Sequence, residues 1–169
     1  MINKAKLNAS KNDECYTPAE AVVPLIKHLP DWVNIVWCPC DKPDSEIVKA
    51  LKAAGKNVLC THIDSGEDFL KMDYDCPYAQ RADMIITNPP YSNKDDFIAH
   101  CVHLAMPWAL LLPLDSLCGE RRHTLYERAT DVGCITLHKR LDFTGKGKNW
   151  FYNAWVCAWP EMKNKWIQE

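Results

Sequence analysis

The chain has 169 residues and a formal net charge of −2, and 47% of its residues are hydrophobic and 25% are charged. This length and balance predict an ordinary globular protein with a single domain and one core. No apolar run approaches the roughly 20 residues that a membrane span needs, and the mixed-charge segment 1–13 does not resemble a secretory signal. The negative charge argues against a globally basic surface, so any contact with nucleic acid must come from a local patch.

Strand-like and helix-like stretches alternate along the chain. The segment 34–40 is a predicted strand, and 44–54 is a predicted helix because Ile47, Val48 and Leu51 share one face and Gly55 ends it. Further strands are predicted at 57–63, 82–87, 108–112, 134–138 and 155–159, and further helices at 95–105 and 120–130. This order predicts an α/β fold with a mostly parallel sheet and helices on both faces. The last two strands, joined by a polar loop, are expected to form an antiparallel hairpin.

Polar residues follow several of these strands. In open α/β sheets ligands bind beyond the carboxyl ends of the strands, so the residues that follow the strands are expected to share one crevice. They are Asp41, Asp64, the segment 88–91 and the segment 113–116.

The most informative of these segments is Asn88-Pro89-Pro90-Tyr91, directly after an apolar strand. Proline holds the preceding residue extended, so the Asn88 amide oxygen and the Pro89 carbonyl can be fixed as two neighbouring acceptors. An exocyclic amino group of a nucleic-acid base can donate to both. The two acceptors would stabilise the positive charge that develops on that nitrogen during methyl transfer. Tyr91 can stack on the extruded base.

Asn-Pro-Pro-Tyr after a strand resembles motif IV of the S-adenosylmethionine-dependent amino-methyltransferases, the DNA N6-adenine and N4-cytosine methylases, and especially the small phage-type adenine methylases. The resemblance implies a Rossmann-like methyltransferase fold with a seven-stranded sheet and the cofactor S-adenosyl-L-methionine. It assigns catalysis to the motif IV residues Asn88, Pro89, Pro90 and Tyr91. It assigns cofactor binding to Tyr16, Thr17 and Pro18 before the first helix, Pro39, Cys40 and Asp41 of motif I, Asp64 for the ribose, Asp68 and Phe69 for the adenine, and Asn88.

The chain departs from this family in two respects. Motif I normally carries a Gly-x-Gly turn, whereas Cys40-Asp41-Lys42-Pro43 has no glycine. The chain also has no room for a separate target-recognition domain, so residues 1–169 are expected to form one methyltransferase domain. A loop rich in basic and aromatic residues is instead expected to contact the substrate, since bases stack on such rings while lysines follow phosphates. This loop is 141–152, and its predicted contacts are Phe143, Lys146, Lys148 and Phe151. For Trp150 and Trp155, packing against the sheet edge is at least as good an explanation.

These observations predict a DNA adenine-N6 methyltransferase, cytoplasmic in a bacterial host or a phage-infected cell. Its partner is expected to be DNA rather than a membrane, with a homodimer or a target-recognition partner as further expectations. Cytosine N4, RNA and protein glutamine remain alternatives, because each offers a planar amino group. A methyltransferase-fold binding module without catalysis is the alternative of another class. The nine cysteines include no CxxC pair, which predicts reduced thiols and no metal site.

Overall fold

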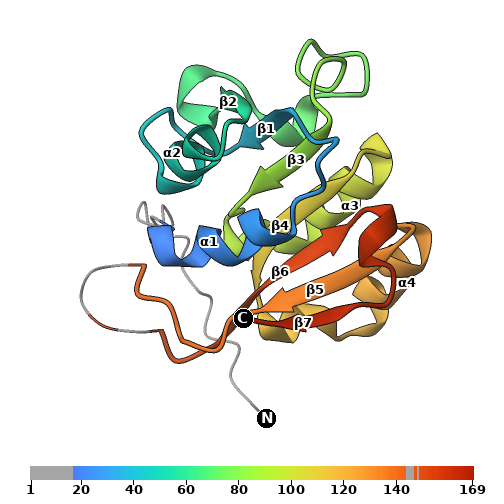
Figure 1. Ribbon diagram of the computed structural model, residues 1–169. Coiled ribbons are helices and arrows are strands. Elements are labelled where there is room, and N and C mark those ends of the chain that lie inside the picture. Colours follow the sequence, from blue (N-terminus) through green and yellow to red (C-terminus); the bar gives the residue numbers. More distant parts are fainter. Residues whose placement is uncertain (1–16, 144–146, 148) are drawn as a thin grey trace.

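The computed structural model describes residues 17–143, 147 and 149–169. Seven strands form one sheet in the order β2-β1-β3-β4-β6-β5-β7 (Figure 1). Their bounds are β1 Ile35–Pro39, β2 Asn57–Thr61, β3 Met84–Thr87, β4 Trp108–Pro113, β5 Val132–Thr136, β6 Asn153–Ala158 and β7 Trp166–Gln168.

Most neighbouring strands of the sheet are parallel. The pairs β1–β2, β1–β3, β3–β4 and β5–β7 are parallel, whereas β6 runs antiparallel between β4 and β5. The predicted α/β class, the mostly parallel sheet and the antiparallel β5–β6 hairpin are therefore confirmed. Because β6 runs in the opposite direction, its first residue, Asn153, lies beside Pro113 at the carboxyl end of β4.

Four α-helices cover the sheet, two on each face. They are α1 Ala19–His28, α2 Glu46–Ala53, α3 Lys94–Leu104 and α4 Glu120–Arg128, and the short 3-10 turns are η1 Ile63–Ser65, η2 Phe69–Lys71, η3 Tyr91–Asn93, η4 Leu114–Leu117 and η5 Pro160–Met162. Ser45 begins α2 by accepting a hydrogen bond from the backbone N–H of Val48, which is an N-cap. Among the described residues, no helix is long and apolar enough to cross a membrane.

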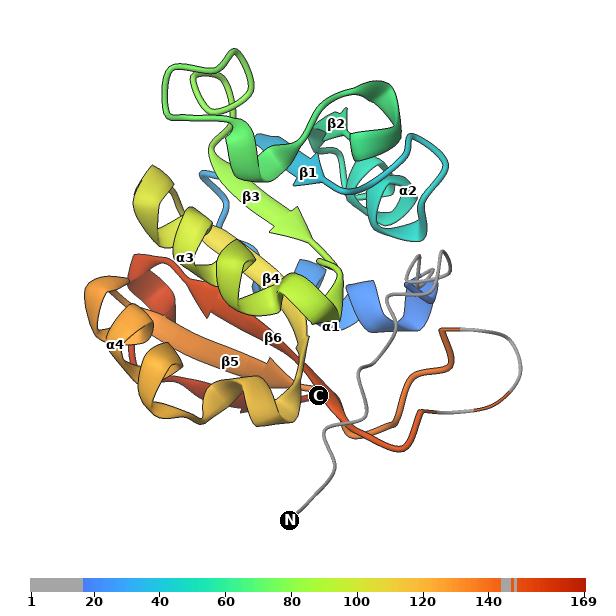
Figure 2. The same cartoon turned by 180° about the vertical axis from the view of Figure 1, so that it is seen from behind.

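The alternation of side chains along the strands divides the core into two clusters. Val36 and Cys38 of β1 face the cluster that contains α1 and α2, while Trp37 faces the cluster that contains α3. Figure 2, seen from behind, shows α3 and α4 together on that second face. With both faces covered, the carboxyl edge of the parallel strands is where the fold can leave a ligand-sized cavity.

Candidate functional site

A cavity of about 360 Å³ opens beyond the carboxyl ends of β1 and β3. The loop between β5 and β6 extends at the same edge of the sheet (Figure 1). Three segments supply most of the wall, namely the turn after β1 with the start of α2, the turn after β2, and the turn after β3. The lining residues are Thr17, Cys40, Asp41, Lys42, Asp44, Ser45, Glu46, Lys49, His62, Asn88, Pro89, Pro90 and Tyr91.

Asn88 lies directly after the last residue of β3. Its amide nitrogen donates a 3.0 Å hydrogen bond to the hydroxyl of the buried Thr17. The two prolines that follow stiffen the turn, and Pro89 is buried. Asn88 is thus held by the segment before α1 as well as by its own strand. The structure brings together the predicted residues Thr17, Asn88 and Pro89 in one wall.

Cys40 takes the backbone conformation that explains how this turn forms without glycine. Its φ angle is +73°, in the left-handed region that normally favours glycine. The conformation is fixed by a 2.8 Å hydrogen bond from the Cys40 N–H to the carbonyl of Thr61, at the end of β2. The chain therefore turns at the segment that resembles motif I, with a strained backbone at Cys40.

Asp41 is the buried charge of the site. It is 7% exposed, and its carboxylate accepts a 2.9 Å hydrogen bond from the Thr87 hydroxyl, which also contacts the carbonyl of Pro39. Burial raises the pKa of Asp41 from 3.8 to about 6, although hydrogen bonds from Thr87 and Ser45 act in the opposite direction. The cavity thus contains a buried carboxyl group whose charged form a cationic or hydrogen-bond-donating partner would stabilise.

A second polar segment lies at the rim, after β2. His62 lines the cavity, and its ring accepts a 3.1 Å hydrogen bond from the backbone N–H of Asp64. The Asp64 carboxylate forms a 2.9 Å ion pair with Lys42, which lowers the pKa of Asp64. Asp64 itself is 60% exposed and lies outside the cavity lining. Its predicted contact with the cofactor ribose stays a prediction.

Asp68 and Phe69 lie farther along the same connection. Asp68 accepts a hydrogen bond from the Leu70 N–H and begins η2. Phe69 is 3% exposed, stacks on Phe97 at 5.2 Å between ring centroids, and meets the edge of Trp37 at 5.1 Å. In this structure the Phe69 ring belongs to the core, and its predicted contact with the cofactor adenine also stays a prediction.

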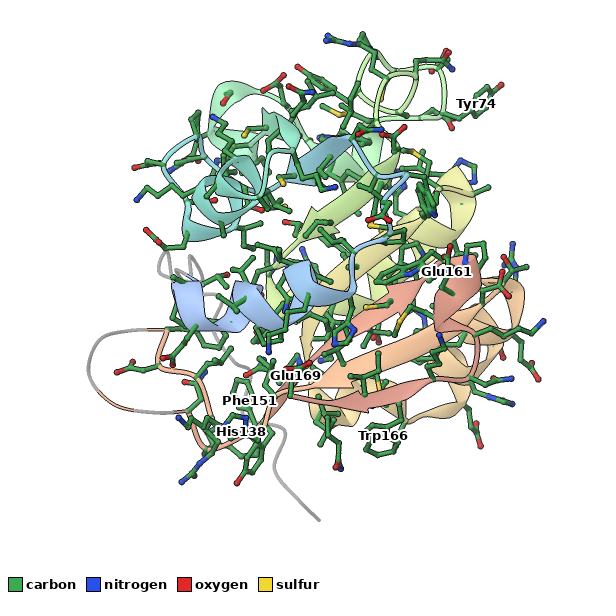
Figure 3. All side chains as sticks on the ribbon, viewed as in Figure 1. Tyr74, His138, Phe151, Glu161, Trp166 and Glu169 are labelled. Atoms are coloured by element: carbon green, nitrogen blue, oxygen red, sulfur yellow. The ribbon has the colours of Figure 1, made fainter. Side chains whose placement is uncertain are left out.

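Aromatic side chains surround Tyr91 on the other side of the cavity. Phe143 and Phe151 each meet the Tyr91 ring edge to face, at 6.1 and 5.9 Å between centroids. Trp150, which is 86% exposed, packs against Phe151. Figure 3 shows Phe151 far from Tyr74, which projects at the opposite side of the molecule. The structure thus places two of the predicted substrate contacts, Phe143 and Phe151, beside the predicted catalytic turn.

Some predicted site residues lie outside the described residues, and some lining residues were not predicted. Tyr16, Lys146 and Lys148 belong to the first group. Pro18 begins α1 and Pro39 ends β1, and neither is among the lining residues of the cavity.

The residues that the prediction missed are Lys42, Asp44, Ser45, Glu46, Lys49 and His62. Ser45 carried a usable signal, since a serine before an apolar helical pattern is a typical N-cap.

The likeness of this chain to known proteins lies in its fold. No protein-family model and no curated protein sequence matches this chain. Several solved structures resemble it, among them the following three. This chain spans about half the length of the first, on which the fold assignment rests. That structure, described as the modification subunit of a type I restriction enzyme from Vibrio vulnificus, matches 95% of this chain and 48% of its own at 13% identity, with a TM-score of 0.59. The second is described as a class I S-adenosylmethionine-dependent methyltransferase from Listeria monocytogenes (11% identity, 95% and 67% coverage, TM-score 0.49). The third is a protein-(glutamine-N5) methyltransferase from Alicyclobacillus acidocaldarius (14%, 84% and 90%, 0.44).

The sheet order and this likeness together identify the architecture. The antiparallel β6 between β4 and β5 completes a seven-stranded sheet whose first four strands in space are parallel. The chain has a Rossmann-like methyltransferase fold.

Proposed function

We propose that this chain is an S-adenosylmethionine-dependent methyltransferase that methylates an exocyclic amino group of a nucleic-acid base, with DNA adenine N6 as its substrate. The observation that carries the proposal is the Asn88-Pro89-Pro90-Tyr91 turn, which follows β3 directly and forms one wall of the cavity. The description of the Vibrio vulnificus protein as a modification subunit agrees with a nucleic-acid substrate.

The cavity has donors and acceptors that fit the proposed cofactor. Asp41 supplies a buried carboxylate, His62 a ring at the end of β2, and Cys40 a tight turn that lets the backbone approach a ligand. When bound there, S-adenosylmethionine would supply a methyl group activated by a sulfonium charge. The described part of the chain contains no cluster of three or more side chains suited to a metal ion.

The residues of the turn would act on the amino group. The lone pair of that nitrogen is delocalised into the base, so it is a weak nucleophile. The Asn88 amide nitrogen is directed to Thr17, and its buried amide oxygen would accept one amino hydrogen of a base that enters the turn. The Pro89 carbonyl would accept the second. Both acceptors favour a pyramidal nitrogen and stabilise its developing positive charge until one proton is released, so no covalent enzyme intermediate is needed.

The test begins with the wild-type chain, labelled S-adenosylmethionine, and DNA and RNA of mixed sequence. Nucleoside analysis then identifies the methylated base and the polymer together. The expected product is N6-methyladenine in DNA. A labelled cytosine, a labelled RNA or a labelled protein would each reject the proposed substrate, and absence of any transfer would reject the proposed activity.

Asn88→Ala tests the role of the turn. We expect turnover to fall by about 10²–10³-fold, because the lost acceptor acts mainly in the transition state. The free energy of unfolding should change by no more than about 1 kcal/mol, the scale of the single hydrogen bond to Thr17. Asn88→Asp should retain partial activity, because a carboxylate also accepts hydrogen bonds. Asn93→Ala is the matched control, since Asn93 makes no side-chain cap at the start of α3. Full turnover in Asn88→Ala would falsify the mechanism.

A further inference from the structure

Asn153 is a buried polar residue beside the predicted catalytic turn that the proposed mechanism does not use. It is the first residue of β6 and pairs with Pro113 at the end of β4. Its side chain is fully buried, and its amide nitrogen donates a 2.8 Å hydrogen bond to the hydroxyl of Tyr91. The two residues are 62 positions apart in the chain.

The sheet does not require an amide at this position. The backbone of β6 is paired on both sides, with β4 and with β5, whatever side chain Asn153 carries. Within the described residues the Asn153 amide oxygen has no hydrogen-bond partner. A buried polar atom without a partner is unfavourable, and such cases in folded proteins call for an explanation. Among the described residues, the hydrogen bond that the side-chain amide makes is the one to Tyr91, so its role is to be sought there.

Tyr91 is held from three directions. Asn153 binds its hydroxyl, while Phe143 and Phe151 meet its ring edge to face. The ring also lines the cavity next to Pro90. Aromatic contacts alone leave a ring free to slide and tilt, because they are weakly directional. A hydrogen bond at the hydroxyl removes that freedom, since it fixes the far end of the side chain to a strand of the sheet.

We propose that Asn153 is a positioning residue: it tethers the Tyr91 hydroxyl and so fixes the ring on which the target base stacks, in register with the two acceptors of the turn. The inference rests on the proposed function, because it assumes that Tyr91 contacts the base. A tethered ring would hold the amino nitrogen of the base near the position from which it attacks the methyl group in line. Loss of the tether should therefore lower kcat more than it weakens nucleic-acid binding.

Four variants test the tether. Asn153→Leu removes the hydrogen bond at similar volume, Tyr91→Phe removes it from the other side, and the double variant combines both. Asn153→Asp is the conservative rescue, since a carboxylate can accept a hydrogen bond from the Tyr91 hydroxyl. Cys157→Ala is the matched control, because Cys157 is also fully buried on β6 and its thiol contacts the carbonyl of Trp155 rather than the turn.

We expect kcat to fall about tenfold in Asn153→Leu, the scale of one hydrogen bond. Tyr91→Phe and the double variant should show the same loss, because each removes the same contact. Asn153→Asp should recover most of kcat, and Cys157→Ala should equal the wild type. Unchanged kcat in Asn153→Leu, or losses that multiply in the double variant, would overturn the inference, since a purely structural role of Asn153 does not depend on the Tyr91 hydroxyl.

A readout without turnover separates this inference from the proposed function. With tyrosine labelled at ¹³Cζ, the Tyr91 resonance is identified by its absence in Tyr91→Phe. Its chemical shift should move in Asn153→Leu and stay in place in Cys157→Ala. An unmoved resonance in Asn153→Leu overturns the tether even in an active enzyme. A moved resonance in a protein that methylates no polymer supports the tether and rejects the proposed function.

Discussion

The buried carboxyl group of Asp41 makes the stability of the protein depend on pH. Burial raises its pKa from 3.8 to about 6 in the folded state. Below pH 3.8 the group is protonated in both the folded and the unfolded chain, and it does not affect stability. Between pH 4 and 6 the unfolded chain loses this proton first, so stability falls as the pH rises. Above pH 6 the free energy of unfolding no longer changes with the ionisation of Asp41, and it is lower by about 3 kcal/mol than it is below pH 3.8.

Asp41→Asn should separate stability from binding. The neutral amide has no ionisation penalty, so at pH 8 the free energy of unfolding should exceed that of the wild type by up to about 3 kcal/mol. The difference should vanish near pH 4, and affinity for S-adenosylmethionine should fall because the charged acceptor is gone. Urea unfolding at several pH values and calorimetric titration measure the two effects. The exposed Asp75→Asn is the control. A stability difference independent of pH would contradict this account.

Cys40 offers a second test of a single residue. In its left-handed conformation a Cβ atom is unfavourable by about 1–2 kcal/mol. Cys40→Gly should therefore be more stable than Cys40→Ala, the reverse of the usual order, by about 1 kcal/mol. The same pair of changes at Cys38, within β1, should show the usual order, with alanine more stable. Denaturant midpoints of the four variants decide the question, and alanine above glycine at both positions would exclude strain at Cys40.

At the scale of the elements, the strands that could be predicted are those whose apolar runs are long enough to show a pattern. All six predicted strands correspond to β1–β6. The position of the seventh, Trp166–Gln168, was not predicted, because three residues with two exposed side chains carry no periodic signal. The predicted strand 57–63 ends early, at Thr61, because the His62 side chain accepts a hydrogen bond from the Asp64 N–H and begins η1.

The site was predictable only where a local pattern marks it. Asn88 and Tyr91 follow a strand within a recognisable tetrapeptide. Asn153 has no such marker, because its role depends on the insertion of β6 beside β4 and on a contact with a residue far away in the chain. His62 was missed because a histidine after a strand has no specific pattern, whereas an acidic residue at that place resembles a ribose-binding group.

The loop between β5 and β6 carries a prediction at this scale. Trp150 is 86% exposed and packs only on Phe151 among the ring contacts of the described residues, so the fold does not need its indole. If bases stack there, Trp150→Ala should weaken binding of single-stranded DNA by about 1–3 kcal/mol. Trp166→Ala is the control, because Trp166 is 66% exposed on the edge strand β7 (Figure 3). Fluorescence anisotropy gives both affinities. Equal affinities in the two variants would show that the indole of Trp150 does not bind bases.

Over the whole molecule, charge limits how nucleic acid can bind. The chain has 20 lysine and arginine residues against 22 aspartate and glutamate residues. Several of these basic residues are paired in the described structure, among them Lys42 with Asp64 and Arg122 with Asp95. The net negative charge therefore favours phosphate binding by a local group of cations, and the sequence between β5 and β6 contains two lysines, Lys146 and Lys148. We infer that phosphate contacts are few and that their removal is measurable one by one.

Lys146 and Lys148 are chosen from the sequence, because both lie outside the described residues. Each phosphate contact that is lost should lower the slope of log affinity against log salt concentration by about 0.9 on duplex DNA and about 0.7 on a single strand. Lys146→Ala with Lys148→Ala should therefore lower the slope by about 1.8 on duplex DNA and about 1.4 on a single strand, while affinity for S-adenosylmethionine stays the same. Lys163→Ala with Lys165→Ala is the matched control, because that pair lies at the turn before β7, at the opposite edge of the sheet strands from the cavity. The measurement is DNA affinity over a series of salt concentrations. A slope unchanged in the first pair, or lowered equally in both pairs, would mean that the loop does not follow phosphates and that the polymer contacts another face.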